Sequence, residues 1–284
     1  MIRKNIRLRK EYLFKKQKEI KDTEKKLAVK KAIEEDRAVP FELRHEEKEL
    51  RHQLENDDDN TLVKRSHIDD EYEEAKYKDP KVMITTSRSP SSRLMNFQKE
   101  LRLIVPNSIR VNRGAYVIKG LVKICQENDI SDMIILHEHR GEPDGMIVCH
   151  LPFGPTAYFG LNNVILRHDL KERPATMSEA FPHLIFDNFQ TRLGDRISDI
   201  LKYIFPLPKV DSKRLMTFSN SDDYISFRHH VYEKEGEEVK LKELGPRFEL
   251  KPYQISLGTV DQPNAKKEWV LRPYMNTSKK RTAL

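Results

Sequence analysis

The sequence predicts an α/β protein of two pseudo-symmetric α/β lobes, preceded by a charged, largely helical N-terminal extension. Three observations carry this prediction. Short apolar strands alternate with amphipathic helices from Pro80 onward, several motifs recur 100 residues apart, and charge is segregated into blocks near the N-terminus. A chain of 284 residues has room for two such lobes beside polar flanks.

The composition argues against a membrane protein and against a secreted one. Hydrophobic residues make up 37% of the chain and charged residues 34%, which predicts a core diluted by charged flanks. Apolar runs such as Met133–Leu136 are too short to span a bilayer, and Arg and Lys occur throughout the first twenty residues. With only Cys125 and Cys149, neither a disulfide framework nor a structural zinc site is expected, so we expect a reducing compartment, cytosol or nucleus.

Residues 1–79 form a basic arm followed by an acidic segment. Residues 1–31 hold 13 basic and 4 acidic side chains, a net charge of +9, and residues 32–79 hold 8 and 17, a net charge of −9. Basic arms bind RNA phosphates through counterion release, whereas an acidic stretch shields such an arm or docks on a basic protein. The simpler alternative is a solvated, highly charged helix.

The basic arm carries a repeating aliphatic residue that predicts a long helix. Ile6, Leu13, Ile20 and Leu27 recur every seven residues and therefore share one narrow stripe. The positions three or four residues further along are mostly charged, so the stripe is not a complete coiled-coil seam. We expect a helix that is marginal alone and that lays this stripe on a protein partner.

The first lobe, about residues 80–180, is expected to begin with a strand at Val82–Thr86. Ser89-Pro90-Ser91-Ser92 then supplies an N-cap hydroxyl with proline at the first helical position. The predicted elements that follow are a helix with Leu94, Phe97, Leu101 and Ile104 inward, a strand at Ile109–Asn112, a helix with Val117, Leu121, Ile124 and Cys125 inward, a central strand at Met133–Leu136, and a hairpin of Met146–Leu151 with Thr156–Leu161.

The second lobe, residues 181–264, starts in the same way. The segment Leu101–Pro106 aligns with Leu201–Pro206 without a gap, and Gly154-Pro155 has a counterpart in Gly245-Pro246. We interpret this as an internal duplication in which the second lobe has lost one helix. Its predicted elements are a strand at Leu184–Phe186, a helix with Leu193, Ile197, Ile200, Leu201 and Ile204 inward, and long strands at Tyr224–Tyr232 and Arg247–Leu257 with a bulge or edge at Pro252. Residues 265–284 are expected to form a last strand and a basic tail.

Several of these segments together resemble the Brix-domain family of ribosome-biogenesis proteins. The resemblance covers about residues 82–262, and the second lobe carries what looks like the family's sigma-like motif, Pro182–Phe189 running into Arg192–Arg196. The remaining matching motifs are Thr85–Leu94, His137–Gly141, Gly154–Ala157, Arg167–Asp169 and Gly245–Leu250. The acidic segment 32–79 has no matching family motif.

The resemblance implies a fold and a role. Each half of a Brix domain is similar to a tRNA-synthetase anticodon-binding domain. The basic arm and tail are most like those of the branch that belongs to the U3 small nucleolar ribonucleoprotein. That branch implies a non-enzymatic factor of the nucleolar small-subunit processome. Its implied partners are U3 snoRNA, pre-ribosomal RNA, a sister Imp subunit and the acidic scaffold Mpp-ten, and its implied process is 18S rRNA maturation. No cofactor is implied.

The candidate RNA contacts are polar or cationic side chains at expected strand ends, loops, one helix and both tails. Guanidinium groups suit bidentate phosphate binding, although each one is equally well explained as a surface charge. The candidates are Ser87, Arg88, Ser89, Arg93, Arg113, His139, Arg140, Arg167, His168, Arg192, Arg196, Arg3, Lys4, Arg7, Lys279, Lys280 and Arg281.

Simpler explanations compete at several positions. Arg192 and Arg196 have Asp195 and Asp199 at salt-bridge spacing on the same helix. Hairpin aromatics either stack on bases or fill the core, and for Phe159 the core is favoured. The residue four positions after His137 is Gly141, so the spacing of a zinc protease is missing, and neither a phosphate loop nor a Gly-x-Ser-x-Gly elbow occurs. We therefore expect neither a metal nor an active site.

Two rival functions remain open from the sequence. The lobes of a protein-interaction scaffold would mainly grip partner proteins, with RNA contacts only in the tails. An aminoacylation accessory domain follows from fold kinship alone, which is weak support.

Overall fold

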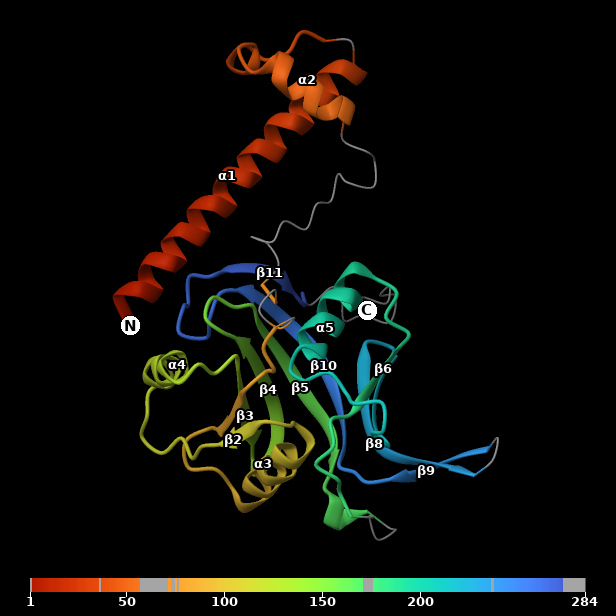
Figure 1. The fold of residues 1–284 in the computed structure, drawn as a ribbon. Coiled ribbons are helices and arrows are strands. Elements are labelled where there is room, and N and C mark those ends of the chain that lie inside the picture. The colour runs from red at the N-terminus through yellow and green to blue at the C-terminus, as the bar shows by residue number, and fades with distance from the viewer. Residues whose placement is uncertain are drawn as a thin grey trace. The chain divides into compact units, whose positions relative to one another are not determined.

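The computed structural model describes residues 2–35, 37–56, 71–72, 75, 77–170, 176–235, 238–272 and 284 of the chain. Two compact units follow one another along the sequence, residues 1–73 and 74–284, and Figure 1 shows their elements. Within the described residues no helix combines the length and the apolar character needed to cross a membrane. The expected domain boundaries after residues 79 and 264 stay predictions.

The N-terminal unit is helical, as the sequence predicts. Its elements are α1 (Ile2–Glu34), a 3-10 helix at Phe41–Leu43 and α2 (Glu47–Asn56). Val29, Ala32, Val39 and Leu50 are buried together and form a small core between the helices. The core involves only the end of α1, so packing within this unit stabilises only that part of the helix.

The stripe predicted on α1 is described for two of its four residues. Leu13 is 46% exposed and Leu27 is 52% exposed. The side chains of Ile6 and Ile20 lie outside the described residues. A protein partner for this stripe therefore stays a prediction.

The first lobe of the second unit is built around three parallel strands followed by a hairpin. β2, β1 and β3 pair in parallel, and β3, β4 and β5 pair antiparallel. α4 packs on one face of the sheet, and α3 covers the other. The elements are β1 (Val82–Thr86), α3 (Ser92–Ile104), β2 (Ser108–Arg110), α4 (Ile118–Glu127), β3 (Asp132–His139), β4 (Glu142–His150) and β5 (Thr156–Ile165).

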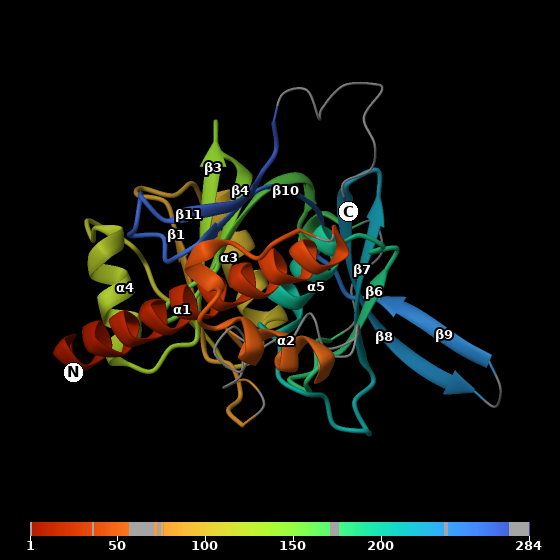
Figure 2. The same ribbon diagram turned by 90° about the horizontal axis from the view of Figure 1, so that it is seen from above.

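The second lobe repeats most of this arrangement. β6 pairs in parallel with β7, and β7, β8 and β10 pair antiparallel in turn. β9 adds to β8, and the two strands project from the sheet as a ribbon (Figure 2). The elements are β6 (His183–Asp187), α5 (Arg192–Lys202), β7 (Arg214–Ser221), β8 (Tyr224–Glu235), β9 (Glu238–Glu243), β10 (Arg247–Leu257) and β11 (Lys266–Val270).

The two lobes share one sheet and are related by an approximate two-fold axis. Strands β1, β3, β4 and β5 have counterparts in β6, β7, β8 and β10, with the same sequence of parallel and antiparallel pairings. The last strands of the two sets, β5 and β10, pair antiparallel and join the lobes. Ser91 and Thr191, 100 residues apart, cap α3 and α5 by accepting from the amides of Leu94 and Gly194. The predicted α/β fold is therefore confirmed, and the repeated pairing pattern agrees with the interpretation of an internal duplication.

A buried arginine ties the lobes together. Arg214 on β7 donates to the carbonyl oxygens of Leu103 and Ile104, at 2.7 and 2.9 Å, at the end of α3 in the first lobe. Its Nε donates to His229 Nε2 at 2.9 Å. Because Arg214 only donates, His229 Nε2 must accept, and His229 Nδ1 carries the proton that Gly245 O accepts at 3.1 Å. His229 is thus a neutral imidazole.

Lowering the pH is expected to destabilise the protein through His229. Burial, and then Arg214, lowers the pKa of His229 to about 3, whereas the unfolded chain has a pKa of about 6.5. Between these values the unfolded chain binds a proton that the folded chain does not, so stability is present above pH 6.5 and is lost as the pH falls. Urea unfolding at pH 7 and pH 5 should show a loss of about 2 kcal/mol from this residue. His229→Gln should show a flatter pH dependence, and an unchanged one would contradict the prediction.

Three expectations about local structure were wrong. α3 begins at Ser92, so Pro90 lies before the cap instead of in the first turn, because the hydroxyl that accepts from the helix amide of Leu94 is that of Ser91. In the helix α4, Leu121 and Cys125 are buried as predicted, but Ile124 and the capping residue Val117 are exposed, because the buried face runs through Val122 instead. β7 and β9 were not predicted as strands. The bulge at Pro252 is confirmed by a register shift between β10 and β5.

Candidate nucleic-acid interface

Three segments of the first lobe bring arginines to one edge of the sheet. Ser87 N donates to Leu136 O at 2.8 Å, so the chain leaving β1 stays beside β3, and Val111 N donates to Ile84 O at 3.0 Å, so the chain leaving β2 stays beside β1. This edge is where the parallel strands β1, β2 and β3 end, which is the usual binding edge of an α/β sheet. We use the term arginine edge for Arg88, Arg113 and Arg140, which follow β1, β2 and β3 in turn.

Like charges are held close together at the arginine edge. Burial, and then the charge of Arg88, lowers the pKa of Arg113. Burial, and then Arg113, lowers the pKa of His137 at the end of β3. Arg113 is held in place because its Nε donates to Tyr116 O at 3.3 Å, while its carbonyl accepts from Tyr116 N at 3.1 Å. A bound anion would relieve this repulsion.

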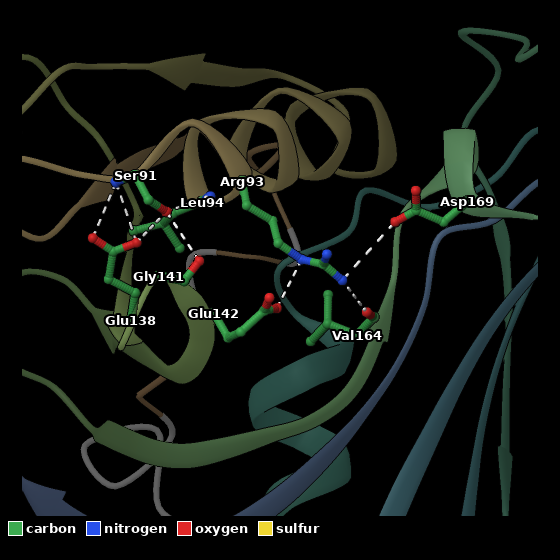
Figure 3. Close-up of polar contacts among 8 residues, drawn as sticks. All are labelled: Ser91, Arg93, Leu94, Glu138, Gly141, Glu142, Val164 and Asp169. Carbon is green, nitrogen blue, oxygen red and sulfur yellow. Dashed lines mark hydrogen bonds and ion pairs between the residues drawn. The ribbon is translucent and has the colours of Figure 1, made fainter.

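The nearby carboxylate of Glu138 accepts hydrogen bonds from the residue that caps the start of α3. Ser91 N donates to both of its oxygens, at 3.0 and 3.2 Å, and Ser91 Oγ makes a short hydrogen bond to Oε2 (Figure 3). Ser91 Oγ also accepts from Leu94 N. Because Glu138 binds the capping residue of α3, its negative charge stabilises the positive N-terminal end of that helix.

Removing the α3 cap is expected to cost more than removing the matching α5 cap. Ser91→Ala should lower the free energy of unfolding by about 2 kcal/mol, because it removes both the cap and the hydroxyl that binds Glu138. Thr191→Ala removes the cap of α5 and should cost about 1 kcal/mol. Urea unfolding of both variants at pH 7 measures the difference. Equal losses would show that the contact with Glu138 adds nothing.

The guanidinium group of Arg93 contacts acidic and carbonyl groups of the first lobe. Its Nε lies 2.7 Å from Glu142 Oε2, and its Nη2 lies 3.9 Å from Asp169 Oδ2 and donates to Val164 O at 3.5 Å (Figure 3). Its side chain is 41% exposed. A phosphate at Arg93 would have to compete with these carboxylates.

Arg167 lies where the two lobes meet. Its amide donates to both oxygens of the buried Glu100 at 3.1 Å, and its Nε donates to Leu244 O at 2.9 Å. Burial raises the pKa of Glu100, although the hydrogen bond from Arg167 opposes this. The neighbouring His168 is exposed.

The remaining candidates are spread over the rest of the chain. Arg192 is exposed on α5, and Arg196 Nη2 lies 3.2 Å from Glu268 Oε2 on β11. In the first lobe, Ser87 is half-buried, and Ser89 and His139 are exposed. On α1, Arg7 pairs with Glu11 at 2.8 Å. Outside the described residues lie the side chains of Arg3 and Lys4 and the whole of Lys279, Lys280 and Arg281.

Sequence reasoning missed two features of this edge. His137 was considered only as a metal ligand, yet it lies beside Arg113 and shares its environment. Glu138 was not assigned a role, although the acidic residue at a strand end opposite a predicted helix start was a usable signal. In the part of the chain that the structure describes, His137, Glu138 and His139 form no metal-binding group. Phe159 is fully buried, as favoured, and Tyr158 is half-buried with its ring 5.8 Å from that of Tyr253.

Two repeated lobes that share one sheet define a two-lobed α/β fold. The chain belongs to the Brix domain family, whose model matches residues 87–254. It is 54% identical over 289 residues to the U3 small nucleolar ribonucleoprotein protein IMP4 of Rattus norvegicus, covering 100% of this chain and 99% of the relative. It is 46% identical to the protein of that name from Schizosaccharomyces pombe, covering 96% of each.

Solved structures provide a weaker comparison. A probable ribosomal biogenesis protein from Aeropyrum pernix superposes with a TM-score of 0.46 and 17% identity, over 61% of this chain and 96% of that one. The archaeal Imp4-like protein Mil superposes with a TM-score of 0.40 and 14% identity, over 62% and 99%.

Proposed function

We propose that this chain is a non-enzymatic, RNA-binding assembly factor of the U3 small nucleolar ribonucleoprotein in the nucleolar small-subunit processome. It promotes or stabilises the pairing of U3 snoRNA with pre-ribosomal RNA for 18S rRNA maturation. A sister Imp subunit and the Mpp-ten scaffold are its protein partners. The observation that carries the proposal is the end-to-end similarity to proteins named as U3 ribonucleoprotein subunits. The arginine edge supports it because it offers fixed cations for phosphates.

The test combines recovery from cells with pairing in solution. Purification of the tagged full-length chain should enrich U3 snoRNA and pre-ribosomal RNA over another small nucleolar RNA. The purified chain should then speed the pairing, or slow the separation, of two labelled RNAs that carry the complementary U3 and pre-ribosomal segments. Enrichment without any effect on pairing would limit the role to membership of the particle. No enrichment at all would refute the proposal.

The scaffold remains the second candidate. It is favoured by the internal contacts of Arg93, Arg167 and Arg196 and by the exposure of Leu13 and Leu27 on α1. A full-length variant with less basic tails, carrying glutamine at Arg3, Lys4, Lys279, Lys280 and Arg281, separates the two. If this variant no longer crosslinks to RNA yet still recovers its protein partners, the scaffold is correct.

A further inference from the structure

The backbone of the arginine edge is repeated in the second lobe. The spacing of 100 residues places Asp187 and Asn188, at the end of β6, where the first lobe has Ser87 and Arg88 at the end of β1. The turn between β7 and β8 likewise corresponds to the turn between β3 and β4. Both turns have two consecutive residues of positive φ, with values of 52° and 83° for Arg140 and Gly141 in the first lobe. The second lobe has values of 52° and 66° in its turn, for Asp222 and Asp223.

The corresponding edge of the second lobe carries the opposite charge, although only Arg140 and Asp222 are a matched pair. Asn188 stands where the first lobe has Arg88, Asp187 stands where it has Ser87, and Arg113 after β2 has no counterpart. We use the term aspartate edge for Asp187, Asp222 and Asp223. Asp187 Oδ2 accepts from Ser219 Oγ at 2.9 Å, and Asp223 Oδ1 accepts from Leu284 N at 3.0 Å, while Asp222 is exposed. The equivalent ends of the two lobes therefore differ in charge, with arginines at the end of β1, β2 and β3 and carboxylates at the end of β6 and in the turn after β7.

The two edges lie at opposite ends of the sheet. β5 and β10 are antiparallel, and following the pairings outward makes β6 and β7 run antiparallel to β1 and β3. The ends of β1 and β3 therefore point away from the ends of β6 and β7. Phosphates are attracted to the arginine edge and repelled by the carboxylates of the aspartate edge, which lies at the far end of the sheet.

We propose that, of the two corresponding edges, only the arginine edge of the first lobe binds RNA phosphates, and that the aspartate edge of the second lobe is not an RNA site. The proposal rests on the RNA-binding function given above and specifies which lobe carries it. Contacts to phosphates fix the position of the protein on the RNA backbone and do not depend on the base sequence of the RNA.

Matched variants of the full-length chain test the proposal. One carries Arg88→Gln, Arg113→Gln and Arg140→Asn, and the other carries Asp187→Asn, Asp222→Asn and Asp223→Asn. Asparagine is chosen for Arg140 and for the aspartates of the turn because it tolerates positive φ, and it keeps an oxygen acceptor in place of each carboxylate. The two variants change the net charge by the same amount in opposite directions. Thermal unfolding confirms that each is folded.

The measurement is the affinity for two labelled stem–loop RNAs, one from U3 and one of unrelated sequence, over a series of salt concentrations. The arginine variant should bind both RNAs more weakly, and its plot of log affinity against log salt should be shallower by about 2 to 3, since each phosphate contact contributes about 0.7 to 0.9. The aspartate variant should keep the wild-type slope. Lysine at all three arginine positions should restore most of the slope.

Each other outcome overturns the proposal in a recognisable way. A wild-type slope in the arginine variant would place the phosphate contacts elsewhere. A change of slope in the aspartate variant as large as that in the arginine variant would show that overall charge, and not the edge, is being measured. If the wild-type chain binds neither RNA, the proposed RNA-binding function itself fails, and the question of which lobe binds does not arise.

Discussion

Replacing Arg214 with methionine is expected to lower the free energy of unfolding of the lobes by about 3 to 5 kcal/mol. Methionine fills similar space but cannot donate hydrogen bonds. The carbonyl oxygens of Leu103, Ile104 and Ala180 would lose the donor that Arg214 now provides, and so would His229 Nε2. Each buried acceptor left unpaired costs about 1 to 3 kcal/mol, although these costs are not additive. Thermal unfolding should show a midpoint lower by roughly 10 °C.

The charge of Arg214 makes this loss larger than for a neutral side chain. Burial lowers the pKa of Arg214 to about 10, so the residue is still charged at pH 7. The carbonyls of Leu103 and Ile104 belong to the end of α3, where the helix dipole favours a cation. Arg214→Lys keeps the charge, but its single ammonium group cannot reach acceptors on several elements at once. This variant should therefore show more than half of the loss of unfolding free energy expected for Arg214→Met.

Arg228→Met is the matched control for this prediction. Arg228 lies on β8, directly opposite Thr217 of β7, and is half-buried with a donor bond to Phe227 O at 2.9 Å. Its replacement should cost less than about 1 kcal/mol. An Arg214→Met protein that unfolds at the same temperature as the Arg228→Met protein would show that the bonds between the lobes contribute nothing to stability.

The sequence predicted the elements whose signals are local. The helix face of Leu94, Phe97, Leu101 and Ile104 is buried as expected, because helical spacing decides which residues meet the sheet. The recurrence after 100 residues located α5 and β6 for the same reason. Such patterns are complete within about ten residues of chain, so no knowledge of the tertiary contacts was needed.

β7 escaped prediction because of a long-range contact. Its inward face starts with Arg214 and continues with Met216, Phe218 and Asn220, so a polar residue stands at each end of the buried row. Arg214 belongs in the core only because α3, which is more than 100 residues earlier, supplies acceptors for it. A pattern of hydrophobic residues cannot reveal a partner so distant in the sequence.

In the candidate site, too, local features were predictable from the sequence and long-range contacts were not. Strand ends located the arginines of the arginine edge, since a loop after a parallel strand is predictable from sequence. Which arginines form ion pairs within the protein was not predictable, because Glu142 on β4 pairs with Arg93 on α3, and Glu268 on β11 pairs with Arg196 on α5. The opposite charge of Arg140 and Asp222 was present in the sequence, but the two positions can be compared only when the turns of the two lobes are seen to have the same backbone.

Replacing Gly154 with alanine is expected to destabilise the second unit by about 4 kcal/mol or more. Gly154 precedes β5 and has a φ of 104°, outside the region that residues with a side chain adopt readily. A Cβ there would lie 2.7 Å from both N and O of Gly258. The backbone of Gly258 has little freedom to move away, since its O accepts from Thr156 Oγ1 at 2.6 Å and its N donates to Ser256 O at 3.0 Å.

Gly114→Ala separates the two causes of this loss. Gly114 also has a positive φ, 53°, but a Cβ at this position has nothing within 4 Å, so only the backbone cost of about 1 to 2 kcal/mol remains. Urea unfolding of both variants should therefore give a difference of roughly 2 to 3 kcal/mol, which is the cost of forcing β5 away from the segment after β10. Because β5 and β10 are the strands that join the lobes, losses of equal size would mean that this close approach is not part of what holds them together.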